Sequence, residues 1–518
     1  MLEGSVFTGS QRASMKRNLA IRILHIAAVQ QIALACILLL TSAALAQSGR
    51  PVATNQALHK AQPAKATIPA LLLSDIHFEP FWDPAKAPQL ASAPVSEWKA
   101  ILAAAPSPDQ QQRFAALQQS CHARGVDTSF ALFDASLKVM RSHAAGVKFV
   151  TLSGDLLSHA FQCKFKTLFP QSTPADYRAF VEKTLDYVMG ELYGAFPNVP
   201  VYAALGNNDS DCGDYRLDAH SEFLAVTGKE VTKYFPASER QGAEESFAAG
   251  GYYSVSLPAP IENARLLVLN DLFMSSKYAT CSGNADQSAA DEQLTWLRQQ
   301  LAEARANKQK IWVMGHIPPG VDLHSTVTKM VDVCGGKSPV MFLSSEKMAD
   351  VIAEFSDVVE LAIFGHTHMD ELRLLKDDGQ NPASGKNVAV KMVASISPIN
   401  GNHPSITVAQ IDPSSAELVD YKVFAASNQS GVGAAWTEEY DFARSYHEAE
   451  FTSSSVSQLI AGFAADPVAI TPASQNYIED FSVGFATPLL RLAWPQYVCT
   501  LSNHTQQTFK ACVCPAAQ

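Results

Sequence analysis

Short apolar runs alternate with longer stretches of helical periodicity between residues 67 and 425. The pattern predicts three clear helices, over residues 130–145, 175–193 and 289–307. The last of them carries an apolar stripe at steps of three and four, formed by Leu294, Leu297, Leu301 and Ala304. This spacing places all four on one helical face. Strand-like runs alternating with helices are typical of an α/β domain, which we predict over residues 67–425.

The N-terminal segment has the pattern of a signal peptide. Four basic residues between positions 12 and 22 precede an apolar run that ends in Ala44-Leu45-Ala46. Small residues at these positions predict cleavage after Ala46, which makes 1–46 the signal peptide and Gln47 the new terminus; Met15 is an alternative start. A retained membrane anchor is the other reading, but the run is shorter than the ~20 residues that a span requires. Residues 47–66 lack periodicity and are predicted to form a flexible leader.

The section from 426 to 518 predicts a helical C-terminal extension that packs on the main domain and ends in a cluster of cysteines. Eight cysteines lie outside the predicted signal peptide: Cys121, Cys163, Cys212, Cys281, Cys334, Cys499, Cys512 and Cys514. An even set in an exported protein favours disulfides, although spacing alone leaves their connectivity open.

Composition restricts the classes of partner. The chain of 518 residues is 47% hydrophobic and 17% charged, as in globular proteins, and its formal net charge is -11. The sequence has no run of Lys and Arg, which argues against a nucleic-acid duplex as partner, and no later stretch is long enough to span a membrane. An acidic surface repels phosphate compounds, so a site for them would need local positive charge, for which metal ions are the obvious source.

Five apolar runs end in polar side chains that can bind metals. In chain order these side chains are Asp75 and His77, Asp155, Asn207, His316, and His366 and His368. Ligands of open α/β sheets bind outside the carboxyl ends of the strands, so we expect all seven at one edge. Glycine precedes the polar tip in four of the five runs, where it permits a sharp turn and a close approach to an ion.

Each piece alone has an ordinary explanation. A Gly-Asp or Gly-His pair is a common turn, and Asn207-Asn208-Asp209 also reads as one. Together, however, the pieces follow the order D-x-H, G-D, G-N-x-D/E, G-H, G-H-x-H. In this the chain resembles the calcineurin-like metallophosphoesterases, which implies a four-layer α/β/β/α sandwich.

Within that superfamily, the chain is most similar to the acid-sphingomyelinase-like branch, which includes secreted phosphodiesterases and endopolyphosphatases. Three segments carry the resemblance: the G-H-I-P-P-G motif at 315–320, the G-D-x-x-x-H motif from Gly154 to His159, and the N-x-P-S motif at 402–405.

The resemblance also implies roles for the seven residues. Asp75, His77 and His368 would hold one divalent ion, Asn207, His316 and His366 would hold a second, and Asp155 would bridge both. Mixed nitrogen and oxygen ligands suit Zn, with Mn or Fe as alternatives, better than Mg or Ca. A hydroxide bridging the ions would attack phosphorus in line.

Asn208 departs from the family pattern. Most members have His at this position, and an amide cannot deliver a proton to a leaving group near neutral pH. His159 is predicted to take the role, although it also fits a surface loop. Endopolyphosphatases share the G-N-N-D motif, and a phosphate leaving group departs readily without an acid. Asn208 therefore favours phosphoanhydride substrates without excluding phosphodiesters.

These features predict an exported phosphodiesterase or phosphohydrolase, secreted or periplasmic, acting on a phospholipid head group, a nucleotide or polyphosphate. The leader is too short for the lipid-presenting domain of the sphingomyelinase, which favours a soluble substrate. An endopolyphosphatase-like enzyme is the main alternative, and a phosphomonoesterase is a third. A non-catalytic metal-binding surface protein is supported only by Asn208.

Overall fold

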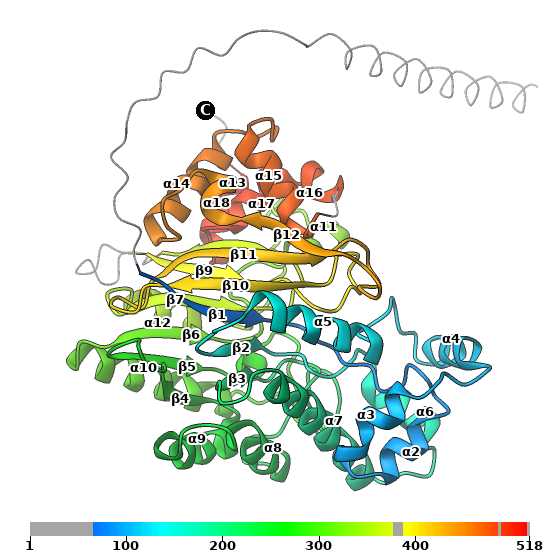
Figure 1. The fold of residues 1–518 in the computed structure, drawn as a ribbon. Helices are drawn as coiled ribbons and strands as arrows, with labels where there is room; N and C mark the ends of the chain where they lie inside the picture. Colours follow the sequence, from blue (N-terminus) through cyan, green and yellow to red (C-terminus); the bar gives the residue numbers. More distant parts are fainter. Residues whose placement is uncertain (1–65, 377–386, 485–487, 515–518) are drawn as a thin grey trace, which may run out of the picture. The chain divides into compact units, whose positions relative to one another are not determined.

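The structure, a computed structural model, describes residues 66–376, 387–484 and 488–514, with side chains in the last range from residue 490 onward. The predicted signal peptide and residues 47–65 of the predicted leader lie outside the described residues. Two six-stranded sheets form the centre of the described chain (Figure 1).

The first sheet has the strand order β12-β11-β10-β1-β2-β3. Its strands are β1 (Ile68–Leu73), β2 (Val150–Ser153), β3 (Val201–Ala204), β10 (Ser405–Ile411), β11 (Leu418–Ala426) and β12 (Trp436–Asp441). Strands β1, β2 and β3 are parallel, with Leu71 opposite Val150 and Val150 opposite Val201. Their carboxyl ends therefore lie at the same edge of the sheet.

The second sheet has the order β4-β5-β6-β7-β9-β8. Its strands are β4 (Tyr253–Ser256), β5 (Ala264–Val268), β6 (Lys310–Met314), β7 (Val359–Phe364), β8 (Glu371–Leu375) and β9 (Val388–Met392). Strands β5, β6, β7 and β9 are parallel, and β4 and β8 are antiparallel edge strands. The parallel strands are almost wholly buried, which explains why they read as continuous apolar runs.

The two sheets pack face to face, and helices cover their outer faces. Between the sheets, the buried rings of Phe149 and Trp312 meet edge to face with centroids 5.7 Å apart. Helices α5 (Phe130–His143) and α7 (Pro174–Ala195) pack against the first sheet, and α10 (Ser288–Ala306) and α12 (Lys347–Glu354) pack against the second (Figure 1). The expected α/β/β/α arrangement is confirmed.

The three helices predicted from periodicity are α5, α7 and α10, and their ends differ from the prediction by two residues at most. Local signals explain where two of them begin. The Ser129 hydroxyl accepts a hydrogen bond from the Leu132 N–H at the start of α5, and Thr173 with Asp176 forms a capping box before α7. Three residues of the predicted stripe on α10 are buried, and Leu294 is partly buried.

Shorter helices fill the connections. They are α2 (Ala87–Ser92), α3 (Val95–Ala103), α4 (Gln110–Ser120), α6 (Phe161–Leu168), α8 (Glu222–Thr232), α9 (Ala237–Gly250), the 3-10 helix η1 (Asp271–Met274) and α11 (Leu323–Thr328). None of the described helices is long and apolar enough to cross a membrane.

The last part of the chain is helical, but it begins with a strand. Strand β12 pairs with β11 and extends the first sheet beyond residue 425. Six helices follow: α13 (Phe442–Tyr446), α14 (Ser453–Ala464), α15 (Pro472–Phe481), α16 (Pro488–Leu492), α17 (Trp494–Thr500) and α18 (Gln506–Val513). They pack on both sheets, and the hydroxyl of Tyr497 in α17 donates to Glu371 of β8 at 3.0 Å.

All eight cysteines outside the predicted signal peptide form disulfides. The pairs are Cys121–Cys163, Cys212–Cys281, Cys334–Cys514 and Cys499–Cys512. The third links the loop after α11 to the C-terminal helices across 180 residues of sequence. Such bonds persist in oxidising compartments.

Candidate metal centre

Strand ends from both sheets bring the seven predicted ligands together. Strands β1, β2 and β3 lead to Asp75 and His77, to Asp155 and to Asn207; strands β6 and β7 lead to His316 and to His366 and His368. His366 is partly exposed and the other six are buried. The two sheets are joined here directly, because the backbone N–H of His366 donates to the Asp75 carboxylate at 3.0 Å.

The first group contains Asp75, His77 and His368. The Nε2 atoms of His77 and His368 face each other at 3.1 Å. Both lie near Oδ1 of Asp75, at 3.6 Å from His77 and 3.4 Å from His368. Three potential ligand atoms thus converge on one point.

The second group contains Asn207, His316 and His366. Nε2 of His316 lies 3.2 Å from Oδ1 of Asn207 and 3.3 Å from Nδ1 of His366. Asp155 stands between the groups, with its Oδ2 atom 3.4 Å from Nε2 of His77 and 3.2 Å from Nε2 of His316. One carboxylate therefore reaches both groups.

Close packing at the strand ends explains the glycines. A Cβ atom on Gly206 would lie 2.1 Å from Oδ1 of Asp155, and one on Gly365 would lie 2.0 Å from the Ser74 hydroxyl and 2.6 Å from Oδ2 of Asp75. Neither position has room for a side chain. Glycine is required so that the strand ends can approach one another.

Five of the seven residues adopt positive φ angles, a conformation that non-glycine residues rarely take. They are Asp75, His77, Asp155, His366 and His368, with φ between 47° and 71°. Each such residue costs free energy that the surrounding fold must supply, and strain of this kind gathers at functional sites.

Hydrogen bonds to the outer ring nitrogens orient two of the histidines. Nδ1 of His77 lies 2.8 Å from the carbonyl oxygen of Leu157, and Nδ1 of His316 lies 2.8 Å from that of Ser153. A carbonyl oxygen only accepts, so both Nδ1 atoms carry the proton. In the neutral rings Nε2 then presents its lone pair to the centre, as in metal-binding histidines.

The charges of the centre are strongly coupled. Burial opposes ionisation of Asp75 and Asp155, but neighbouring histidines outweigh it and hold both pKa values well below the usual range. Burial also opposes the imidazolium forms of His77 and His316, but Asp155 and other carboxylates raise their pKa values to about 9 and about 10. Burial lowers the pKa of His366 to about 3 and that of His368 to about 4, so both rings are neutral.

These residues fit a pair of metal ions. Two ring nitrogens bound to one ion at the usual 2.0–2.1 Å lie about 3 to 3.4 Å apart, close to the separations found in both groups. Buried carboxylates need a compensating positive charge, which ions would provide. The centre is therefore a candidate His/Asp metal site with a shared carboxylate.

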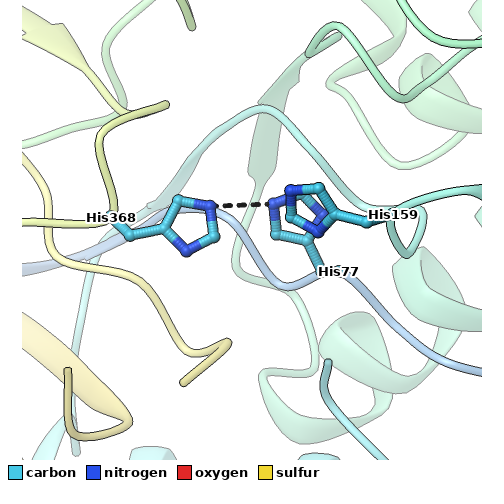
Figure 2. Close-up of side chains that lie close together, drawn as sticks. All are labelled: His77, His159 and His368. Carbon is cyan, nitrogen blue, oxygen red and sulfur yellow. Dashed lines mark hydrogen bonds between the residues drawn. The ribbon is translucent and has the colours of Figure 1, made fainter. Parts of the chain in front are cut away.

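His159 lies at the partly open end of the first group. Figure 2 shows its ring stacked on that of His77, with His368 opposite, and the His77 and His159 centroids are 4.1 Å apart. Nδ1 of His159 lies 3.1 Å from Oδ1 of the buried Asp127, which also accepts from the Ser397 hydroxyl at 3.0 Å. The ring is 37% exposed, so it faces both the centre and solvent.

Asn208 holds Asp155 through two hydrogen bonds. Its backbone N–H donates to Oδ1 of Asp155 at 2.8 Å, and its side-chain amide donates to Oδ2 at 2.9 Å. The adjacent Asp209 accepts from the N–H groups of Gly206, Leu156 and Leu157 at 2.8–2.9 Å. The Asn208-Asp209 pair thus holds the ends of β2 and β3 together around Asp155.

Sequence reasoning missed two buried carboxylates at the centre. Asp271, at the end of β5, accepts from the N–H groups of His316 at 2.9 Å and Ile317 at 3.0 Å. It follows an apolar run like the other strand ends, so the same pattern could have found it. Asp127, which holds His159, follows no strand, and no comparable signal marks it.

Residues 68–370, more than half of the chain, match the calcineurin-like phosphoesterase family. The chain belongs to this family and is a metal-dependent phosphoric ester hydrolase. Substrates of such enzymes are small or polymeric phosphates.

Curated relatives are distant phosphodiesterases. The chain is 24% identical over 307 residues to sphingomyelinase phosphodiesterase C of Dictyostelium discoideum, covering 58% of this chain and 62% of that protein. It is 24% identical over 402 residues to human acid sphingomyelinase-like phosphodiesterase 3b, covering 75% and 80%. It is 27% identical over 262 residues to human cyclic GMP-AMP phosphodiesterase SMPDL3A, covering 48% and 53%. A dimetal phosphatase of Danio rerio aligns with a TM-score of 0.38 at 12% identity, covering 72% of this chain and 98% of that one.

Proposed function

We propose that this chain is an exported dinuclear-metal phosphoesterase that hydrolyses phosphodiester or phosphoanhydride bonds. The carboxylate of Asp155 carries the proposal, because it lies within 3.4 Å of ring nitrogens from two separate ligand groups. A single-ion site would need only one of these groups.

Each group would hold one ion. Asp75, His77 and His368 would bind the first, Asn207, His316 and His366 would bind the second, and Asp155 would bind both; zinc suits this ligand set best. Bound ions would supply Lewis-acid polarisation of a phosphoryl oxygen and would lower the pKa of water towards neutrality. Asn208 fixes both oxygens of Asp155 through its two hydrogen bonds.

His159 supplies a proton to the leaving-group oxygen in this proposal. Asp127 holds its Nδ1 atom, which leaves Nε2 free for the substrate. The two residues form a donor with a buried orienting carboxylate, the arrangement expected of a general acid. His159 then takes the role of the histidine that most family members have at the position of Asn208.

Export rests on two features. The sequence predicts a signal peptide over 1–46, and four disulfides join all the remaining cysteines. The mature chain would then comprise the leader, a catalytic domain over 67–425 and the C-terminal extension over 426–518, in either the periplasm or the extracellular space.

The names of the relatives favour phosphodiesters, including phospholipid head groups and cyclic dinucleotides. The G-N-N-D segment with Asn208 favours an endopolyphosphatase-like activity as the alternative. A non-catalytic metal-binding surface protein is the remaining possibility, and the intact ligand set weighs against it.

The test is hydrolysis by the chain from Gln47, loaded with Zn²⁺ or Mn²⁺. Bis-p-nitrophenyl phosphate, ATP, long-chain polyphosphate and sphingomyelin are compared, with Asp155→Ala as the control. Turnover that Asp155→Ala abolishes supports the proposal. Two bound ions per chain without turnover of any substrate would favour the non-catalytic alternative.

A further inference from the structure

The second ligand group reaches the surface at His366. His366 is partly exposed, and its Nε2 atom lies 3.3 Å from the Tyr215 hydroxyl. The Phe342 ring meets the His366 ring edge to face at 5.7 Å. This end of the site lies beyond the second group, whereas His159 lies beside the first.

An exposed lysine, Lys277, lies beside Tyr215. The ammonium group of Lys277 donates to the Tyr215 hydroxyl at 3.3 Å and lies 4.7 Å from the centroid of the Tyr215 ring. Among the described residues, no carboxylate lies within ion-pair distance of Lys277, although its charge acts on the buried Asp214, which accepts from the Asn207 amide at 2.8 Å. Lys277 therefore retains N–H donors that are not used in an ion pair.

Backbone hydrogen bonds hold both residues against the site. The N–H of Tyr215 donates to the carbonyl of Asn207 at 2.9 Å, and the N–H of Ala279 donates to the carbonyl of Tyr215 at 3.0 Å. The N–H of Ser276 donates to the carbonyl of Phe342 at 3.0 Å. These bonds connect the loop that carries Lys277 to the segment of Asn207, a predicted metal ligand, and to Phe342, whose ring contacts His366.

The hydrogen-bond roles leave Tyr215 as a donor. Where Nδ1 of His366 binds an ion, Nε2 carries the ring proton and donates to the Tyr215 oxygen. Lys277 donates to the same oxygen, which fills both of its acceptor positions. The phenolic hydrogen is then directed to a third group, and the ammonium retains two further donors.

We propose that Lys277 and Tyr215 bind a second phosphoryl group of the substrate, adjacent to the one that is hydrolysed. The inference rests on the proposed function of the neighbouring centre and narrows its substrate class to phosphoanhydrides. The ions would neutralise one phosphoryl group, but a neighbouring phosphoryl group needs its own cation, and charge-assisted bonds to phosphate are strong. A diester with a single phosphoryl group has nothing to place there.

The test compares two variants with a matched control on three substrates. Lys277→Gln removes the charge and Tyr215→Phe removes the hydroxyl. Lys148→Gln is the control. Lys148 is an exposed residue just before the amino end of β2, away from the carboxyl ends of the strands where the site lies. The substrates are tripolyphosphate, ATP and bis-p-nitrophenyl phosphate, so the first two separate an inorganic chain from a nucleotide.

Lys277→Gln should lower kcat/KM for tripolyphosphate and ATP by about tenfold to a hundredfold, the usual effect of losing a charge-assisted hydrogen bond. Turnover of bis-p-nitrophenyl phosphate should change by less than about twofold, and Lys148→Gln should change none of the three. Tyr215→Phe also removes the acceptor of His366 Nε2, so it should lower turnover of all three substrates, with the larger loss on tripolyphosphate and ATP.

Inhibitor binding gives a second readout. Inorganic pyrophosphate should inhibit the wild type more tightly than orthophosphate, and Lys277→Gln should weaken pyrophosphate alone. Equal losses on all substrates, no loss on any, or equal inhibition by the two anions would overturn the proposal. Inactivity of the wild type on every substrate would instead overturn the proposed function, and calorimetric binding of pyrophosphate to wild type and Lys277→Gln would still decide the role of Lys277.

Discussion

Replacement of Asp271 by alanine tests whether buried carboxylates around the centre hold its backbone in place. Asp271 is fully buried, and its side chain accepts from the N–H groups of His316 at 2.9 Å and Ile317 at 3.0 Å. Alanine would leave both donors buried without a partner. Each unsatisfied buried donor costs about 1–3 kcal/mol, so Asp271→Ala should lower the free energy of unfolding by about 2–4 kcal/mol.

The matched control is Asp286→Ala. Asp286 is a partly exposed carboxylate that accepts from the Ser288 N–H at 2.9 Å, and water can replace it there. Asp286 also accepts from the Ser288 hydroxyl at the first turn of α10, so its removal should lower the free energy of unfolding slightly, and by less than Asp271→Ala. Urea denaturation followed by circular dichroism gives both values under the same conditions.

Metal content provides a second readout for Asp271→Ala. The Asp271 carboxylate holds the backbone N–H of His316, a predicted metal ligand. Asp271→Ala should therefore retain less metal per folded chain than the wild type, while Asp286→Ala should retain as much. If Asp271→Ala unfolds at the same urea concentration as Asp286→Ala, the assignment of Asp271 as an anchor of the His316 loop is wrong.

Three further predictions concern other parts of the chain. His159→Gln should lower kcat for esters with alkyl leaving groups about 10²–10⁴-fold but have little effect on p-nitrophenyl esters, and Asp127→Asn should show the same selectivity more weakly; equal losses on both would refute a proton-donor role. Tyr497→Phe should lower the free energy of unfolding by about 1 kcal/mol, measured in urea, because it removes the hydrogen bond to Glu371 that joins α17 to β8; an unchanged value would contradict this. Burial raises the pKa of Asp480 to about 8, so the stability contributed by its protonated form is present below pH 4 and is lost as pH rises through 8. Asp480→Asn should flatten this loss between pH 4 and 8 in thermal unfolding, and an unchanged slope would refute it.

The strand ends could be predicted because each one combines two local signals. An apolar run of strand length followed by a polar residue is visible in the sequence, and glycine marks four of the five turns. Parallel strands of one sheet end at the same edge, so the sequence pattern alone is enough to place Asp75, Asp155 and Asn207 together. The same pattern predicted all seven residues at one edge of an open sheet, and this was wrong: His316, His366 and His368 come from the second sheet, and the packing of the two sheets brings them to the same centre.

The features that the sequence did not predict depend on contacts between distant segments. Asp127 reaches His159 from a loop before α5, and Lys277 reaches Tyr215 from a loop after η1, without a periodic pattern at either position. The pairing of Cys334 with Cys514 spans 180 residues, and eight cysteines allow many pairings. Strand β12 has a largely polar sequence, which the hydrophobic pattern does not distinguish from a loop. The first sheet therefore has one strand more than the pattern predicted.

The most direct test of the dinuclear centre is a crystal structure of the metal-loaded chain with anomalous scattering data collected at the absorption edge of the bound metal. Two anomalous peaks are expected, one among Asp75, His77 and His368 and one among Asn207, His316 and His366, with Asp155 bound to both. A single peak, or two peaks of which only one contacts Asp155, would contradict a dinuclear centre bridged by Asp155.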